Sequence, residues 1–592
     1  MRDQGLGSWP ARRARMTPGK TALIQVGRSR TYAELAENTT RLAHGLAASG
    51  VSRGDRVAFL GPNSIELVET MFATAKLGAV FIPLNTRLAP PETAYILTDS
   101  GASLLIWAPG FEQVVSAPEL ARLPLDLVPA GEVGRASALL PGRPESIDEP
   151  IGHDDLFMIQ YTSGTTGRPK GVMLTHGNII WNVYNLLVDV DVRSDEVALV
   201  TAPLFHTAAL NQVLFPTLLK GGTALIEGKF DPDRAISLVE EHGVTLLFGV
   251  TSMYLALTQS PRWPHADMGT LRSALSGGAP LPVSLLQAYL DRGLMIVQVY
   301  GLTEASPGAT MLRAADGVRK IGSAGTACFF TDVRVVTPDL ADVAAGEPGE
   351  VLVQGPNVSP GYWRQPAATQ AAFAGDGWLR TGDLAQVDDK GYLHIVDRLK
   401  DLIISGGENI YPAEVEEALY THPAVAGFSG GPRRERRSVH RVCAAQRLAL
   451  RTLPCATGVV QARYRRVVVV VWLSCAMSSR LAARAAFRSW SRSPSWRRRS
   501  AACCSRWVIF WFRASMSAGA PSPDSRHACS PSASESRFSS CRVRAASRSA
   551  RSWAASRSAC RDARVTAGPG PAPADGGAAS SAWIFSSRSR CR

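Results

Sequence analysis

The feature that most restricts the fold is a regular alternation of short apolar runs with helical patterns, which continues to about residue 330. Arg56 to Leu60 is an apolar run, a helical pattern covers Ser64 to Leu77, and the next run is Ala79 to Pro83. Strands that are apolar on both faces and joined by helices form parallel sheets with helices on each side. We therefore expect an α/β fold with doubly wound sheets. The same rhythm returns at Ala198 to Ala202, Thr223 to Glu227, Thr245 to Val250 and Leu294 to Tyr300.

The pattern changes after Thr331, where the strands become short and no long helical pattern lies between them. The three runs are Val333 to Val336, Gly349 to Gln354 and Tyr392 to Val396. Short strands separated by turns are typical of antiparallel sheets. We therefore expect a small antiparallel β unit after the α/β part.

Charge is distributed unevenly along the chain, and this distribution counts against one class of partner. Residues 431–592 contain 31 arginines, no lysine and five acidic residues, whereas residues 1–430 contain 33 basic and 45 acidic residues. The larger part of the chain is therefore acidic, which gives no electrostatic basis for binding nucleic acid. We expect small-molecule partners and no nucleic acid.

Cysteine usage and the length of the apolar runs predict a cytoplasmic chain that does not span a membrane. Cys328 is the only cysteine before position 443, which is typical of a reducing compartment without a disulfide framework. The first 16 residues contain no apolar segment of the kind found in secretory signals. The longest apolar run, Val467 to Leu473, has seven residues, whereas a membrane helix needs ~20. Peripheral membrane association and the oligomeric state stay open.

The sequence after Gly427 loses this organisation. The last lysine is Lys400 and the last asparagine is Asn409, and Arg, Ser, Ala, Cys and Trp then dominate. Three interpretations of residues 427–592 are open: a disordered Arg/Ser-rich segment that binds RNA, an additional ordered domain, or GC-rich nucleic acid translated in a shifted frame. The third is favoured, because the codons of Arg, Ala, Gly and Pro are GC-rich and those of Lys and Asn are not.

The strongest local signal is a run of hydroxyl and glycine residues, YTSGTTGRPKG, from Tyr161 to Gly171. It follows an apolar strand pattern at Leu156 to Ile159 and precedes a helical pattern at Asn178 to Leu187. Hydroxyl groups and glycine N–H groups at the end of a strand can surround a polyphosphate. The run is not a Walker A loop, because no Gly-Lys-Ser/Thr follows at the required spacing.

Further motifs follow in order along the chain. They are SGGAP at Ser276 to Pro280, YGLTE at Tyr300 to Glu304, TGD at Thr381 to Asp383, DRLKD at Asp397 to Asp401 and SGGEN at Ser405 to Asn409. With the hydroxyl-rich run, they show that the chain resembles the adenylate-forming superfamily of acyl-CoA synthetases, adenylation domains and beetle-type luciferases, and most closely its fatty-acyl-CoA ligases. The resemblance covers about residues 8–426. It implies that ATP activates a carboxylate as an acyl-adenylate, which is then transferred to the thiol of coenzyme A.

The resemblance also implies roles for individual residues. Phosphate groups of ATP would be bound by Thr162, Ser163, Gly164, Thr165, Thr166, Gly167 and Lys170. The nucleoside would be bound by Gly278, Ala279, Tyr300 and Gly301 on the adenine side and by Asp383 and Arg398 on the ribose side. Thr303 would lie near the α-phosphate, and Glu304 would bind Mg²⁺, which prefers carboxylates together with phosphate oxygens. The candidate catalytic residues are Thr303, Glu304, Lys170 and His206.

The acyl-binding segment implied by the same resemblance is Pro203 to Asn211, with His206 at the entrance of the pocket. Thr207 and Ala208 are small, and the segment has no aspartate to pair with a substrate amine, which counts against an amino acid. Apolar wall would come from Val250, Thr251 and Met253. A medium- or long-chain aliphatic acid is therefore favoured, and an aromatic or short acid is the alternative.

The small C-terminal domain of this superfamily is only partly recognisable. The resemblance implies a large domain at residues 1–396, a hinge at 397–401 that contains Lys400, and a remnant of the small domain at 402–426, in which Gly406 would line the channel for coenzyme A. The family lysine that reaches the α-phosphate has no counterpart, since no lysine follows Lys400. Loss of one such contact costs ~100- to 1000-fold in rate. We therefore expect a ligase with impaired turnover, and the alternative is a catalytically defective nucleotide-binding relative.

Overall fold

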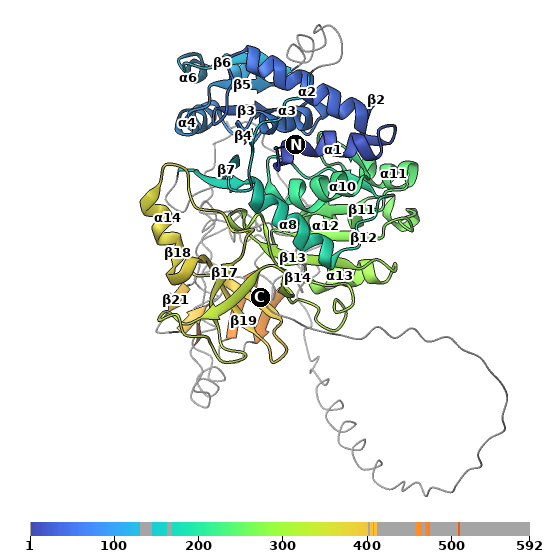
Figure 1. Cartoon of the computed structure of the whole chain (residues 1–592). Coiled ribbons are helices and arrows are strands. Elements are labelled where there is room, and N and C mark those ends of the chain that lie inside the picture. The colour runs from blue at the N-terminus through green and yellow to red at the C-terminus, as the bar shows by residue number, and fades with distance from the viewer. Residues whose placement is uncertain are drawn as a thin grey trace, which may run out of the picture. The chain divides into compact units, whose positions relative to one another are not determined.

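The computed structural model describes residues 2–130, 145–162 and 168–400, together with the backbone of five short strands further along the chain (Figure 1). Those strands are β21 (Ile403–Ser405), β22 (Glu408–Ile410), β23 (Gly458–Arg463), β24 (Val468–Leu473) and β25 (Trp507–Val508). The predicted remnant at 402–426 and the tail at 427–592 otherwise lie outside the described residues. Within the described ranges, no helix has the length and apolar character needed to cross a bilayer.

The first part of the α/β fold is a six-stranded sheet in the order β6-β5-β3-β4-β7-β8. Its neighbours are parallel, except that β7 and β8 are antiparallel. The strands are β3 (Arg56–Leu60), β4 (Val80–Leu84), β5 (Leu104–Trp107), β6 (Asp126–Pro129), β7 (Leu156–Thr162) and β8 (Lys170–Thr175). Helices α3 (Ile65–Lys76) and α4 (Pro90–Ser100) lie between these strands in the chain. The side chain of Ser64 caps α3 by accepting the N–H of Leu67.

The second part is a nine-stranded sheet in the order β15-β14-β13-β12-β11-β9-β10-β1-β2. The strands from β13 to β1 are parallel to their neighbours, and β2, β14 and β15 are antiparallel at the two edges. The strands are β1 (Thr21–Gln25), β2 (Arg28–Thr31), β9 (Val197–Val200), β10 (Thr223–Ile226), β11 (Leu246–Gly249), β12 (Ser273–Gly277), β13 (Ile296–Gly301), β14 (Gly308–Leu312) and β15 (Thr326–Ala327). The helices of this part are α8 (His176–Asp189), α10 (Phe215–Lys220), α11 (Pro232–His242), α12 (Thr251–Gln259) and α13 (Val283–Leu290).

Both faces of the nine-stranded sheet are buried, and successive residues of a strand belong to different cores. Ala198 and Val200 of β9 contribute to one hydrophobic cluster, while Leu199, between them, contributes to another. This alternation follows from the period of two along a strand. The expected doubly wound α/β fold is therefore confirmed.

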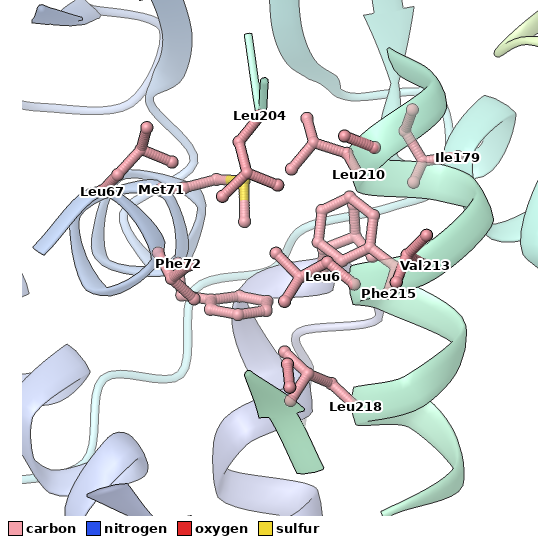
Figure 2. Packing of buried hydrophobic residues seen from close by; sticks show 14 of the residues in the cluster. Leu6, Leu67, Met71, Phe72, Ile179, Leu204, Leu210, Val213, Phe215 and Leu218 are labelled. Carbon is pink, nitrogen blue, oxygen red and sulfur yellow. The ribbon is translucent and has the colours of Figure 1, made fainter. Parts of the chain in front are cut away.

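The first of these clusters is shared by the two sheets, because it contains residues from both. Phe215 of α10 packs against three other aromatic rings in it, with the ring centroids of Trp9 and Phe72 at 6.0 Å and that of Phe157 at 6.1 Å, in edge-to-face arrangements. Figure 2 shows side chains of this cluster from distant parts of the chain, labelled Leu6, Leu67, Met71, Phe72, Ile179, Leu204, Leu210, Val213, Phe215 and Leu218. Leu6 precedes α1 (Trp9–Met16), so the N-terminal segment is part of this core.

The expected small β unit is also confirmed. It is an antiparallel sheet of β16 (Asp332–Val336), β17 (Gly349–Gln354), β18 (Phe373–Ala374), β19 (Trp378–Val387) and β20 (Leu393–Arg398). Asp383 of β19 pairs with Arg398 of β20 in its register, so two of the predicted nucleotide-binding residues are neighbours.

Candidate active site

The parallel strands of the nine-stranded sheet bring four of the predicted segments to one edge. Strands β9, β11, β12 and β13 are neighbours with the same direction. The segments that follow them contain His206, Thr251, Gly278 and Glu304, respectively. Ligands of open α/β sheets bind outside the carboxyl ends of parallel strands, near a reversal of strand order. This edge is therefore the expected position of a ligand site.

The hydroxyl-rich run forms the connection between two antiparallel strands of the six-stranded sheet. Thr162 of β7 pairs with Lys170 of β8, so the two ends of the run lie side by side. Helix α4 supports both ends, because Tyr161 donates a hydrogen bond to Asp99 Oδ2 at 2.6 Å and Tyr95 donates one to the Pro169 carbonyl at 3.2 Å. The predicted residues Ser163, Gly164, Thr165, Thr166 and Gly167 lie outside the described residues.

Lys170 and Glu304 are connected through one tyrosine. The Lys170 ammonium lies 4.9 Å from the centroid of the Tyr362 ring, and the Tyr362 hydroxyl donates a 2.8 Å hydrogen bond to Glu304 Oε1. Burial raises the pKa of Tyr362, and the charge of Glu304 raises it further. Within the described ranges, Lys170 forms no ion pair and Glu304 Oε2 has no hydrogen-bond partner. Among the described residues, Tyr362 thus links a cation without an ion pair to a carboxylate oxygen without a hydrogen-bond partner.

The second contact group begins four residues before Glu304. Tyr300 donates a 2.8 Å hydrogen bond to Asp383 Oδ2, and Arg398 Nε lies 3.1 Å from Asp383 Oδ1. Asp383 is buried, and this burial raises its pKa, although the charges of Arg398 and Lys400 and the Tyr300 hydrogen bond act in the opposite direction. Lys400 is exposed. Asp383, the predicted ribose-binding residue, is therefore hydrogen-bonded to Tyr300, which was predicted to lie beside the adenine.

The Gly278–Ala279 segment directly follows β12, the strand next to the one that carries Tyr300. Gly277, the last residue of β12, pairs with Val299 of β13. Gly278 has a φ of 86°, a conformation that favours glycine. Thr251 donates hydrogen bonds to the carbonyls of Ala279 and Pro280 at 3.3 and 3.1 Å. The exposed residues Gly278 and Ala279 therefore form a ledge at the end of β12, next to the strand that carries Tyr300.

His206 is not part of the Lys170–Glu304 contacts. Its ring packs on Phe205, with centroids 4.6 Å apart, and among the described residues its side chain has no hydrogen-bond partner. The ring is exposed to solvent, yet surrounding protein lowers its pKa and the charge of Arg87 lowers it further. The place of His206 at a pocket entrance and its catalytic role both stay predictions.

A metal ion bound at Glu304 would depend on ligands from the nucleotide. The described residues contain no cluster of three His, Cys, Asp or Glu side chains that could hold a metal ion. Mg²⁺ is commonly held by one or two carboxylates together with substrate phosphates and water. Glu304, whose Oε2 has no hydrogen-bond partner within the part of the chain that the structure describes, fits such a partial site.

Some contributing residues were absent from the sequence predictions. Tyr362 joins Lys170 to Glu304, and Asp99 holds Tyr161. Neither residue belongs to a motif that the sequence analysis recognised. Gly406, which was predicted to line the channel for coenzyme A, lies outside the described residues.

Comparisons with known proteins agree with this geometry. The family model described as "AMP-binding enzyme" matches residues 10–363. A feruloyl-CoA synthase from Amycolatopsis sp is 56% identical over 425 residues, which are 72% of this chain and 85% of that protein. The long-chain-fatty-acid–CoA ligase FadD13 from Mycobacterium tuberculosis is 40% identical over 432 residues, covering 72% of this chain and 84% of the ligase. The structure of O-succinylbenzoate coenzyme A synthetase from Bacillus subtilis with AMP has a TM-score of 0.66 and 31% identity, covering 80% of this chain and 89% of that chain.

Proposed function

The chain belongs to the AMP-binding enzyme family, as an AMP-forming acid–CoA ligase, and from this premise we propose that it activates an aromatic carboxylic acid of the hydroxycinnamate type. The observation that carries the substrate proposal is the 56% identity to a feruloyl-CoA synthase, against 40% to the long-chain ligase FadD13. A medium- or long-chain aliphatic acid, which the sequence analysis favoured, is the second candidate, supported by FadD13.

The proposed reaction has two displacements. An oxygen of the substrate carboxylate attacks the α-phosphorus of ATP, and pyrophosphate leaves with the electrons of the broken P–O bond. The thiolate of coenzyme A then attacks the acyl carbonyl, and AMP leaves. Both steps need charge neutralisation and alignment more than covalent participation by the protein.

The described residues support a division of roles in the first displacement. Lys170, at the base of the hydroxyl-rich loop, neutralises the phosphates, and Thr303 lies near the α-phosphate. Asp383 accepts hydrogen bonds from the ribose, aided by Arg398, and the ledge at Gly278 and Ala279 supports the adenine beside Tyr300. Glu304 would hold Mg²⁺, which when bound supplies positive charge to the phosphate oxygens. His206 would lie near the reacting carboxylate.

We also propose that turnover is impaired. The division into a large domain at 1–396, a hinge at 397–401 and a remnant at 402–426 leaves no lysine to replace the late family lysine, because none follows Lys400. Nucleotide binding, which uses residues of the large domain and Arg398 at the start of the hinge, would be retained. A cytoplasmic location is part of the same proposal, because the first 430 residues contain a single cysteine, Cys328.

The test is an acid panel with the full chain. Ferulate, an aryl acetate, and medium- and long-chain fatty acids are compared in ATP–pyrophosphate exchange and in thioester formation with coenzyme A. We expect the highest, though slow, exchange with ferulate. Preference for a fatty acid would contradict the aromatic proposal, and exchange at a rate ordinary for these ligases would contradict the proposed impairment. Absence of ATP binding would contradict the assigned nucleotide site.

A further inference from the structure

We propose that buried asparagines fix the turn of Glu304 relative to the strand pair β7–β8, and that Asn178 and Asn357 are positioning residues of the ligase. The set, called here the asparagine clamp, consists of Asn178, Asn182, Asn185, Asn211 and Asn357. All five are buried, with exposed fractions between 0% and 7%. The inference rests on the proposed role of Glu304 and extends it to residues that touch no substrate.

Asn178 connects helix α8 to the segment that follows β17. Its Oδ1 accepts the N–H of Thr175 at 3.0 Å and thereby caps its own helix. Its Nδ2 donates to the carbonyls of Pro356 and Val358 at 2.9 and 2.8 Å. The one carboxamide therefore satisfies three backbone groups, which an aspartate or a leucine at this position would not do.

Asn357 makes the corresponding connection to the turn that carries Glu304. Its Nδ2 donates to the carbonyls of Ala305 and Gly308, both at 2.8 Å. Its Oδ1 accepts the Thr331 hydroxyl at 2.8 Å. In addition, the N–H of Ser359 donates to the Glu304 carbonyl at 2.7 Å. Residues 356–359 and the Glu304 turn thus form one hydrogen-bonded unit.

Two further asparagines form hydrogen bonds with the same turn. Asn182 Oδ1 accepts the N–H of Gly308 at 3.0 Å, and Asn211 Nδ2 donates to the Ser306 carbonyl at 2.7 Å. Asn182 also donates to the Asn211 carbonyl at 3.4 Å. The backbone on both sides of Ser306 is therefore fixed from two directions.

Asn185 completes the clamp one helical turn beyond Asn182. Its Nδ2 donates to the Thr331 hydroxyl at 2.9 Å, and Thr331 in turn donates to Asn357. The N–H of Phe330 donates to Asn185 Oδ1 at 2.7 Å. Positions 178, 182 and 185 are four and three residues apart, so they share one face of α8.

The asparagine clamp connects the strand that carries Lys170 to the turn that carries Glu304. Helix α8 follows directly from β8, whose first residue is Lys170. The face of α8 that carries the asparagines is bonded to both segments around Glu304. Removal of a residue that orients a metal ligand by a hydrogen bond commonly lowers metal affinity by about 10- to 100-fold. The clamp therefore sets the position of the Glu304 turn relative to β8 and its first residue, Lys170.

The experiment measures ATP binding by the full chain with Mg²⁺ and with EDTA, since this readout does not require turnover. Asn178→Asp and Asn357→Asp keep the shape and the accepting oxygen but remove both donors. We expect each variant to lose about 10- to 100-fold of the gain in ATP affinity that Mg²⁺ gives, with unchanged affinity in EDTA. Asn38→Asp, on α2 (Tyr32–Ala48), is the matched control, because its Nδ2 bonds to Glu69 of α3, away from the strand ends. This control should keep the full gain.

A double variant separates positioning from general stability. If the clamp acts through Glu304, Asn357→Asp should have no further effect on the gain in a Glu304→Gln background. Additive losses would overturn the proposal, as would variants with lowered melting temperatures but an undiminished gain. If Glu304→Gln itself leaves the gain unchanged, the metal role of Glu304 fails, and the clamp proposal fails with it. Thr331→Val, which removes only the hydroxyl that supports Asn357, serves where Asn357→Asp does not fold, and an undiminished gain in that variant would overturn the proposal.

Discussion

Gly301 provides the sharpest test of the geometry around Glu304. It is the last residue of β13 and pairs with Gly308 of β14 at an irregularity in the register. A Cβ atom at Gly301 would lie 2.6 Å from the carbonyl carbon of Pro307 and 3.2 Å from the nitrogen of Ala309. Carbon atoms in ordinary contact are about 3.5–4.0 Å apart. The carbonyl oxygen of Pro307 would lie closer still, so Gly301→Ala must move β13 and the Pro307 segment apart by more than about 1 Å.

This movement falls on the turn that carries Glu304. The N–H of Leu302 donates to the Pro307 carbonyl at 3.0 Å, so the separation breaks or tilts the bond at the base of the turn. A misplacement of about 1 Å at a reacting site costs about 100-fold, and overpacking typically costs about 1–3 kcal/mol of stability. We expect Gly301→Ala to lose most of the Mg²⁺-dependent gain in ATP affinity and to unfold at lower denaturant concentration.

ATP titrations with Mg²⁺ and with EDTA, together with urea denaturation, measure both effects. Gly19→Ala is the matched control, because no atom lies within 4 Å of its added Cβ. If Gly301→Ala binds ATP and unfolds as the wild-type chain does, the reasoning from the contact to Pro307 is refuted. Equal losses in both variants would also refute it, because they would show a general effect of alanine.

Three further predictions concern stability and the nucleotide. Burial lowers the pKa of His176 from 6.5 to about 3, so the unfolded chain binds a proton at this residue before the folded chain does as the pH falls. The free energy of unfolding of the wild-type chain, compared with that of His176→Gln by urea denaturation, should therefore decrease by about 1.4 kcal/mol per pH unit below pH 6.5. Phe215→Ala should cost about 3–5 kcal/mol in the same assay, whereas Val188→Ala, at an exposed position, should change stability by less than about 0.5 kcal/mol. Asp383→Asn should weaken ATP binding about tenfold, in line with the loss of one hydrogen bond to a charged group. Burial raises the pKa of Asp383, so the carboxylate should become protonated at a higher pH than an ordinary aspartate. ATP titrations across a pH series should therefore show the affinity of the wild-type chain falling at that higher pH.

The strands were predictable where burial on both faces leaves a continuous apolar run. Arg56 to Leu60 is observed as predicted, and the run at Ala198 to Ala202 corresponds to β9 at Val197–Val200. Its last two residues instead begin the segment that leads to His206. Apolar character continues past the end of β9 because that segment is also buried, so the end of the run does not mark the end of the strand.

The candidate site was predictable at its motifs but not in its connections. Tyr300 and Asp383 were assigned to one nucleotide, and a hydrogen bond joins them. Tyr362 lies 58 residues from Glu304 in sequence, and no local pattern distinguishes a tyrosine that bonds to a distant carboxylate from one in a core. The asparagine spacing on α8 was visible in the sequence, but its bonding partners at residues 305–308 and 356–358 depend on tertiary packing.

The N-terminal segment packs against residues that are synthesised much later than it is. The N–H of Leu6 donates to Nδ1 of the buried His176 at 3.1 Å, and Leu6 belongs to the cluster with Phe215 and Leu218. The ribosome therefore synthesises Leu6 long before its partners His176, Phe215 and Leu218. The shared core can close only after some two hundred further residues have emerged, because Phe215 and Leu218 belong to it.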